Sequence, residues 1–167
     1  EACQNLPVST AERERLEDIW DVLVPRGWRA FTAGDFAGAI QLGQRCLSGG
    51  RRPIYALQML GMALLRAGRT AEAEPLLTEF AHGSGRSNAS ELHLADLRLT
   101  QGRPKAALDH LAWLLPRMPA DSVNVPTAFR LLAAVARTGN LQREAQAVLA
   151  SVPALARVAG HAELSRL

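Results

Sequence analysis

The side chains that most often bind metals or transfer protons are few in this chain and lie far apart in the sequence. The four histidines are His82, His93, His110 and His161. A zinc site needs several ligands at short helical or hairpin spacing, whereas these histidines fall one to a predicted helix or turn. His93 and His110 could face each other across a helical hairpin, as a paired or solvent-facing couple. The sequence therefore predicts no metal site and no cofactor.

A glycine-rich stretch, GSGRS at 83–87, has the composition of a phosphate-binding loop. It lacks the preceding strand and the lysine of such a loop, and it lies between two predicted helices, so we interpret it as a connector. A nucleophile and its base must lie close together in space, and serine, cysteine and histidine form no recognisable catalytic pattern in the sequence. We therefore expect the protein not to be an enzyme.

Two cysteines, Cys3 and Cys46, are too few for a disulfide-stabilised scaffold. Cys46 stands among apolar neighbours and is predicted to be a small packed side chain, while Cys3 belongs to a polar leader. A disulfide between Cys3 and Cys46 stays open for an exported protein, and so does a lipid anchor on Cys3. The chain begins at Glu1 without methionine, which either a removed signal peptide or a fragment would explain.

The composition favours helices. Hydrophobic residues make up 48% of the 167 residues and aromatic residues 5%, and the apolar share is mainly alanine and leucine, which have high helix propensity. Runs of β-branched residues in alternation are missing, so no strand is expected. No apolar run is long enough to span a bilayer. The predicted fold class is all-α, without a transmembrane segment.

The positive charge is spread along the chain. The formal net charge is +3, Lys105 is the only lysine, and the arginines are scattered except for the adjacent pair Arg51 and Arg52. A nucleic-acid-binding protein concentrates its basic residues on one face or helix. We therefore expect no nucleic-acid partner.

Three glycines recur at an interval of 34 residues, and each begins the same short pattern. They are Gly34, Gly68 and Gly102, and an alanine follows five residues after each, at Ala39, Ala73 and Ala107. Gly139 continues the series less regularly, because it comes 37 residues after Gly102 and its nearest alanine, Ala145, is one place late. Glycine can take the left-handed conformation that ends a helix, and alanine lets two helices approach closely. The pattern predicts a repeated helix–turn–helix unit.

A helix–turn–helix unit with a period of 34 residues is typical of tetratricopeptide repeats, and the chain resembles that family over residues 20–150. The resemblance implies a right-handed α-solenoid of about four helical hairpins, with an N-terminal helical extension and a C-terminal capping helix. The expected domains are a leader and extension over 1–19, a repeat array over 20–152 and the capping helix over 153–167. Within the array, the units are expected at about 20–52, 54–87, 88–121 and 125–152.

The helices themselves are predicted from apolar periodicity, prolines and turn residues. The expected pairs are 20–33 with 36–48, 54–67 with 71–82, 88–101 with 104–116, and 126–138 with 141–151, followed by a last helix near 153–165. The sequence STAE at 9–12 is a capping-box pattern that starts a helix running into the first pair. Pro25 lies inside that run and should kink or split the helix between Asp21 and Pro25, because proline has no N–H to donate.

In the resembling family, the first helix of each hairpin lines a concave groove that binds a partner. The groove positions of that family are assigned to residues of this chain by counting back from each turn glycine. The predicted partner-binding residues are Trp28, Phe31, Tyr55, Gln58, Met62, Arg66, Asp96, Thr100, Phe129 and Arg137. Aromatic residues, methionine and arginine are common in interface hot spots. The alternative for Trp28, Phe31 and Phe129 is that they pack between helices.

The residues at the central groove position also bear on the kind of ligand. They are Trp28, Met62, Asp96 and Ala133, without the lysine and asparagine with which some members of the family hold acidic chaperone tails. An apolar segment, either an amphipathic helix or an extended peptide, is therefore the expected ligand.

The resemblance implies a scaffold or adaptor that binds another protein. The alanine- and arginine-rich composition is typical of bacteria, in which the family often serves as accessory or assembly factors of secretion, pilus or envelope complexes. Two alternatives stay open, a self-associating structural subunit and a chaperone for a secreted substrate, and a homo-oligomer is compatible with each. The compartment is undecided between the periplasm or envelope, which we favour slightly, and the cytoplasm.

Overall fold

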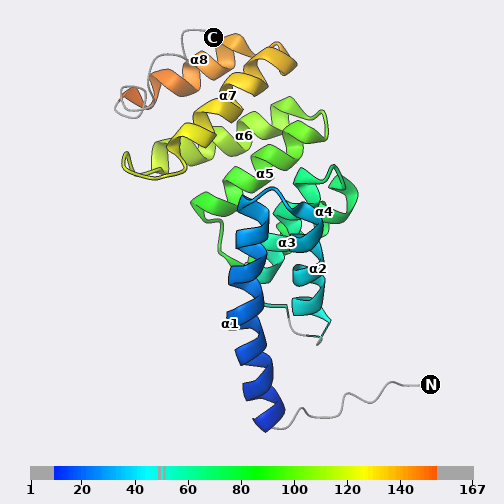
Figure 1. Cartoon of the computed structure of the whole chain (residues 1–167). Coiled ribbons are helices and arrows are strands. Elements are labelled where there is room, and N and C mark those ends of the chain that lie inside the picture. Colours follow the sequence, from blue (N-terminus) through cyan, green and yellow to red (C-terminus); the bar gives the residue numbers. More distant parts are fainter. Residues whose placement is uncertain (1–9, 49, 51, 154–167) are drawn as a thin grey trace, which may run out of the picture. The chain divides into compact units, whose positions relative to one another are not determined.

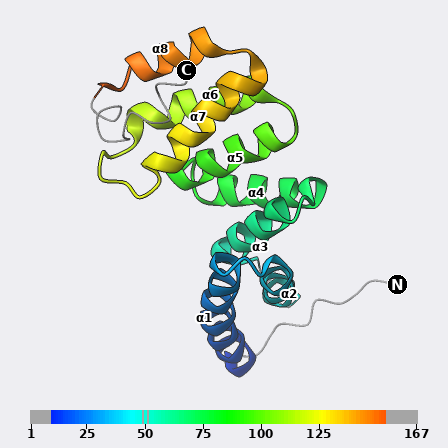
Figure 2. The same cartoon turned by 45° about the horizontal axis from the view of Figure 1, so that its top comes forward.

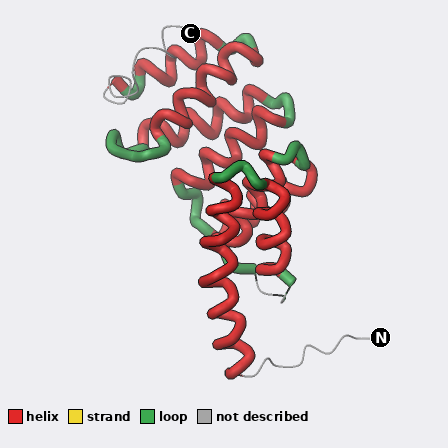
Figure 3. Tube along the Cα trace, in the orientation of Figure 1, coloured by secondary structure: helices red, strands yellow, loops and turns green. Residues whose placement is uncertain are grey.

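The computed structural model describes residues 10–48, 50 and 52–153. This part of the chain is all helical, as the composition predicts, with eight α-helices, one short 3₁₀ helix and no strand (Figures 1 and 3). The elements are α1 (Thr10–Thr32), α2 (Phe36–Leu47), α3 (Ile54–Arg66), α4 (Thr70–Gly83), α5 (Asn88–Thr100), α6 (Pro104–Leu114), η1 (Leu115–Arg117), α7 (Val125–Gly139) and α8 (Gln142–Ala150).

The helices fall into two compact units. The N-terminal unit, Glu1–Arg69, contains α1 to α3, and the C-terminal unit, Thr70–Leu167, contains α4 to α8. The boundary between them separates α3 from α4, the two helices that the sequence predicts as one hairpin over 54–87. Each unit has a hydrophobic core of its own.

In the N-terminal unit, α1, α2 and α3 each contact the other two (Figure 1). The buried core residues of this unit include Leu23, Cys46 and Ala56. The indole N–H of Trp20 on α1 donates to the backbone carbonyl of Cys46 on α2 at 3.0 Å. Glycine allows α2 and α3 to approach closely, because a Cβ atom on Gly43 would lie 2.8 Å from Cβ of Leu60.

The helix α1 is continuous through Pro25, so the predicted split between Asp21 and Pro25 is wrong. Proline removes the hydrogen bond that the carbonyl of Asp21 would otherwise accept within the helix. Both residues are exposed, so water can take the place of the missing donor. One helix, from Thr10 to Thr32, covers both the end of the capping-box pattern and the first helix predicted at 20–33.

In the C-terminal unit, each helix from α4 to α8 contacts the next, and α5 also contacts α7 (Figure 2). The core lies mainly between α5, α6 and α7, with Leu111, Leu132 and Val135 among its fully buried side chains. From α2 to α8 the predicted helix boundaries agree with the structure within two residues. The predicted capping helix at 153–165 lies outside the described residues except for Pro153.

The three predicted turn glycines take the expected conformation. Gly34, Gly68 and Gly102 have φ angles of 81°, 76° and 69°, in the left-handed region that glycine adopts without strain. In each turn the N–H of the following residue bonds back to a carbonyl in the helix, as Arg103 does to Arg98 at 2.8 Å. This bond closes the helix end in the manner of a Schellman motif.

The fourth turn differs from the sequence prediction by one residue. Gly139 is the last residue of α7, and Asn140 takes the left-handed conformation instead, with φ of 52°. Asparagine tolerates this region better than most residues. Ala145 therefore follows five residues after the left-handed position, as in the other turns, and all four alanines at this place are fully buried. Ala145 is late only when it is counted from Gly139, because the left-handed residue of this turn is Asn140.

A polar network joins α4 to α5. Glu74 on α4 accepts hydrogen bonds from Arg98 and from Gln101, the latter at 2.8 Å between Nε2 and Oε2. These side-chain hydrogen bonds, first from Arg98 and then from Gln101, hold the pKa of Glu74 below its ordinary value. The network fixes the C-terminal turn of α5 against the middle of α4.

Candidate interaction surface

The side chains predicted to bind a partner lie on α1 and α3 in the N-terminal unit and on α5 and α7 in the C-terminal unit. Within each unit the two helices contact each other. The N-terminal unit holds Trp28, Phe31, Tyr55, Gln58, Met62 and Arg66, and the C-terminal unit holds Asp96, Thr100, Phe129 and Arg137. The structure therefore groups the predicted residues into two sets, one in each unit.

In the N-terminal unit an aromatic group surrounds the turn between α1 and α2. The rings of Trp28 and Phe31 are 5.5 Å apart in a T-shaped arrangement, which is favourable for aromatic pairs. Phe36, at the start of α2, lies 5.6 Å from Phe31 and was not among the predicted residues. All three are half-buried, so each packs in the unit and still presents part of its ring to solvent. The spacing FTAGDF across the turn glycine Gly34 was the signal that could have identified Phe36.

On α3 the predicted residues differ in exposure. Tyr55, in the first turn of the helix, is 66% exposed. Gln58 is half-buried and Arg66 is exposed, and both make contacts within the chain. Met62 is buried. Tyr55 is therefore the predicted residue on α3 that offers a large apolar surface to a partner.

In the C-terminal unit, burial leaves less of the predicted set accessible. Phe129 is buried in the core of that unit, which fits the alternative that this ring packs between helices. Asp96 is also buried. Thr100 and Arg137 are exposed, and the hydroxyl of Thr100 donates to the carbonyl of Asp96 at 2.9 Å. The α5–α7 surface is thus mainly polar where it is accessible.

Large apolar side chains that are exposed are rare in the described part of the chain. They are Val22 (54%), Tyr55 (66%) and Val123 (89%). Val22 and Tyr55 belong to α1 and α3 of the N-terminal unit, whereas Val123 lies in the connection between η1 and α7. Two of the three exposed apolar side chains and the half-buried aromatic group therefore belong to the N-terminal unit.

The two histidines of the third predicted hairpin, His93 and His110, have different neighbours in the structure. His110 Nδ1 on α6 lies 2.8 Å from Oε2 of Glu91 on α5, and His93 contacts the ring of Phe80 at 5.9 Å. Glu91 is only 3% exposed, and Arg86 occupies its other oxygen, with Nε donating to Oε1 at 3.0 Å. The facing arrangement of His93 and His110 suggested by the sequence is not formed.

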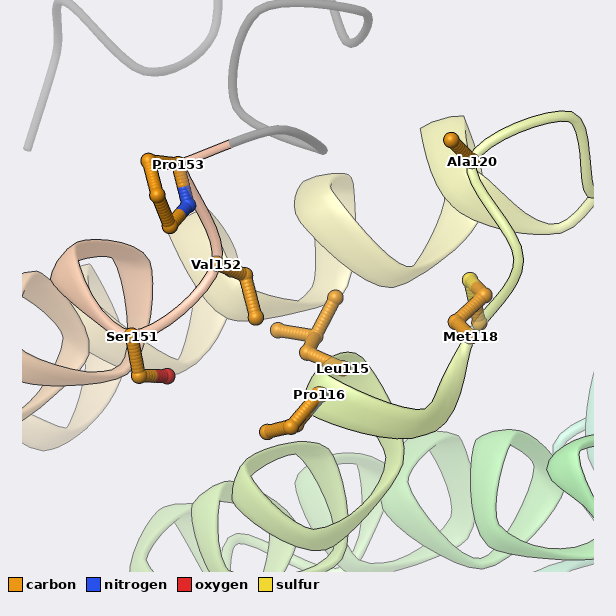
Figure 4. A pocket seen from close by; sticks show the side chains of 7 residues that line it. All are labelled: Leu115, Pro116, Met118, Ala120, Ser151, Val152 and Pro153. Atoms are coloured by element: carbon orange, nitrogen blue, oxygen red, sulfur yellow. The ribbon is translucent and has the colours of Figure 1, made fainter.

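An apolar pocket of about 270 Å³ lies at the ends of α6 and α8 in the C-terminal unit (Figure 4). Its lining residues are Leu115, Pro116, Met118, Ala120, Ser151, Val152 and Pro153. The side chains of Leu115 and Val152 point toward each other in this view. The hydroxyl of Ser151 donates to the carbonyl of Val148 at 2.6 Å. The lining thus supplies no acid or base for proton transfer.

Cys46 is a free, fully buried thiol. Burial raises its pKa above the ordinary value, and the nearby charge of Arg45 opposes this only in part. Cys3 lies outside the described residues, so the disulfide between the two cysteines stays a prediction. In the part of the chain that the structure describes, no three His, Cys, Asp or Glu side chains are placed to hold a metal ion.

None of the helices described combines the length and apolar composition needed to cross a lipid bilayer. Comparison of the chain with models of known protein families, with curated proteins and with solved structures finds no match.

Proposed function

We propose that this protein is an interaction module built from repeats of the tetratricopeptide kind, which holds an apolar helix or extended peptide of a partner protein against α1 and α3. The observation that carries the proposal is the exposure of Tyr55 on α3, in the same unit as the half-buried aromatic pair Trp28 and Phe31 on α1. Tyrosine and tryptophan provide large contact areas at a small loss of conformational entropy.

The local structure of the repeats supports the comparison with that family. Four helices end in a left-handed residue, and a fully buried alanine follows each of these residues at the same distance. Within each unit, contacts run between neighbouring helices and between alternate helices, α1 with α3 and α5 with α7. This is the contact pattern expected of stacked hairpins.

The chemistry of the α1–α3 face favours a partner segment with apolar side chains. Its most exposed large apolar side chain is Tyr55, whereas Met62, at the centre of the predicted groove, is buried. A role as an adaptor or assembly factor in a bacterial multiprotein complex, in secretion, pilus or envelope assembly, follows from the family resemblance. Such a role needs no chemistry beyond reversible binding.

The proposal is tested with Tyr55→Ala. A partner is first captured from the native source by the intact chain, identified by mass spectrometry and purified. Its affinity is then measured by calorimetry for the original chain, for Tyr55→Ala and for Val123→Ala. We expect Tyr55→Ala to weaken binding by about tenfold or more, as for an interface hot spot.

Val123→Ala is the matched control, because Val123 is an exposed apolar side chain that belongs to the other unit and not to α1 or α3. Its affinity should equal that of the original chain, and circular dichroism should show unchanged helix content in both variants. Equal affinities for all three proteins would reject the α1–α3 face as the binding surface. If the captured partner is a second copy of this chain, light scattering will show a mass that rises with concentration, in favour of the structural alternative.

A further inference from the structure

Two guanidinium groups lie over one indole ring in the C-terminal unit. The Cζ atom of Arg86 is 4.4 Å and that of Arg117 is 4.6 Å from the centre of the Trp113 ring. Trp113 is on α6, Arg117 ends the following 3₁₀ helix, and Arg86 lies in the connection between α4 and α5. The electron-rich face of an indole attracts a cation at this distance, so the ring interacts with two positive charges.

Arg86 is held in place by more than the ring. Its Nε donates to the buried carboxylate of Glu91 at 3.0 Å, and the second oxygen of Glu91 contacts His110. Its backbone has a φ angle of 56°, which non-glycine residues rarely adopt. The side chain is nevertheless 58% exposed. Nε is the Arg86 atom that bonds Glu91, and the exposed part of the side chain can meet a ligand from solvent.

Arg117 is oriented in a similar way but lacks an acidic partner. Its Nη1 donates to the backbone carbonyl of Trp113 at 2.8 Å, and the side chain is exposed. No carboxylate in the described part of the chain pairs with it. Of the two stacked arginines, Glu91 neutralises only Arg86, so the pair keeps an excess positive charge on a preorganised platform.

We propose that Arg86, Trp113 and Arg117 form an oxyanion-binding site that takes a carboxylate of an acidic peptide segment. Arginine presents several N–H donors in one plane, which match the two oxygens of a carboxylate. Each arginine already contacts the Trp113 ring and makes one hydrogen bond, Arg86 to Glu91 and Arg117 to the carbonyl of Trp113. Because these contacts restrict both side chains, binding costs less rotamer entropy than at two unrestrained surface arginines. The distance between the two Cζ atoms cannot exceed the sum of their distances to the centre of the Trp113 ring. One acidic segment can therefore reach both guanidinium groups.

An acidic peptide fits this site better than a nucleic acid. A nucleic-acid backbone needs a row of basic side chains to follow its phosphates. Here two arginines converge on one ring, and the other basic residues of the chain are scattered. The site lies in the C-terminal unit and is independent of the Tyr55 surface proposed above, so either assignment can fail without the other.

The experiment uses the full chain labelled with ¹⁵N. The indole N–H of Trp113 and the Nε–H groups of Arg86 and Arg117 are followed by NMR during titration with hexaglutamate blocked at both ends. Inorganic phosphate and a thymidine hexamer are titrated separately. We expect hexaglutamate to shift these side-chain signals saturably and high salt to weaken the effect. Tyr55→Ala should bind hexaglutamate like the original chain.

Arg117→Gln is the decisive variant, because Arg117 is exposed and its loss leaves no buried carboxylate without a partner. Loss of one charge-assisted hydrogen-bonding group should weaken hexaglutamate binding by about tenfold. Arg117→Lys keeps the charge but not the planar donors, and should also bind more weakly than the original chain. Arg130→Gln on α7 is the matched control, since it removes the same charge from an exposed position in the same unit.

Equal weakening by Arg117→Gln and Arg130→Gln would overturn the site, since the effect would then reflect net charge alone. Full affinity in Arg117→Lys would overturn the role of the stacked guanidinium. Binding of phosphate or of the thymidine hexamer that depends on Arg117, without binding of hexaglutamate, would reject the acidic peptide as the ligand. Absence of any saturable shift with hexaglutamate would reject the proposal as a whole.

Discussion

Glu74 links its ionisation to the stability of the α4–α5 contact. Hydrogen bonds from Arg98 and Gln101 favour the ionised carboxylate in the folded chain and lower its pKa from the ordinary value of 4.5. A carboxylate with a lowered folded-state pKa stabilises the fold above its unfolded-state pKa, and this contribution is lost as the pH falls through the folded-state pKa. Acid should therefore weaken the junction between these helices.

We expect Glu74→Gln to lower the melting temperature at pH 7 by a small amount, because the carboxylate is partly exposed and solvent screens its interactions. The difference from the original chain should shrink as the pH falls below 4.5, the ordinary value. Thermal unfolding at a series of pH values measures both effects. Asp121→Asn, an exposed loop change, is the control. A difference that stays constant down to the lowest pH would contradict the link to ionisation.

Single residues were the level at which the sequence was least informative. Nothing in the sequence distinguishes Glu91 from the other acidic residues, yet it is buried between Arg86 and His110. The partners are 5 and 19 residues away, and only the packing of α5 on α6 brings His110 to it. The same packing, together with the conformation of the preceding connection, places Arg86 over Trp113.

Among the structural elements, the helix ends follow from local backbone chemistry. Gly102 has a φ angle of 69°, and Asn140 takes the equivalent position in the fourth turn with φ of 52°. We expect Gly102→Ala to lower the free energy of unfolding by about 1 kcal/mol, the cost of a left-handed conformation for a residue with a Cβ. Asn140→Gly should change it by less than about 0.5 kcal/mol, since asparagine already tolerates this region and glycine gains entropy in the unfolded chain.

Urea unfolding of the two variants beside the original chain measures these differences. A Gly102→Ala protein as stable as the original would show that the turn can use another conformation.

The same local chemistry explains why the helix boundaries were predictable. Proline in the first turn marks α6 and α7, whereas Pro25 in mid-helix was a weaker guide because its exposed position limits the cost.

At the level of the whole molecule, each of the two units has its own core, and a cavity in one core should mainly affect that unit. Leu111 on α6 is fully buried in the C-terminal core. We expect Leu111→Ala to cost about 3 kcal/mol, from lost burial and the cavity left behind. Hydrogen exchange followed by mass spectrometry should show faster exchange in α5, α6 and α7, with little change in α1 and α2.

Equal acceleration in α1 and α2 would show that the two units unfold together. Val22→Ala, at an exposed position on α1, is a suitable control because it removes apolar atoms without creating a cavity.

The division into two units was not predicted. The 34-residue period treats α3 and α4 as one hairpin, and a sequence period carries no information about how strongly successive helices contact each other.

Sequence reasoning was enough to predict the helical class, nearly all helix boundaries, three of the four left-handed turns and the buried alanines beside them. These features depend on backbone conformation and on neighbours a few residues away, which a short stretch of sequence specifies. The three-dimensional packing was needed to learn that Tyr55 is exposed while Met62 and Phe129 are buried, that Glu91 contacts His110, and that two arginines contact Trp113. Exposure and pairing are set by which helices lie against one another, and the contacts concerned join residues that are distant along the chain.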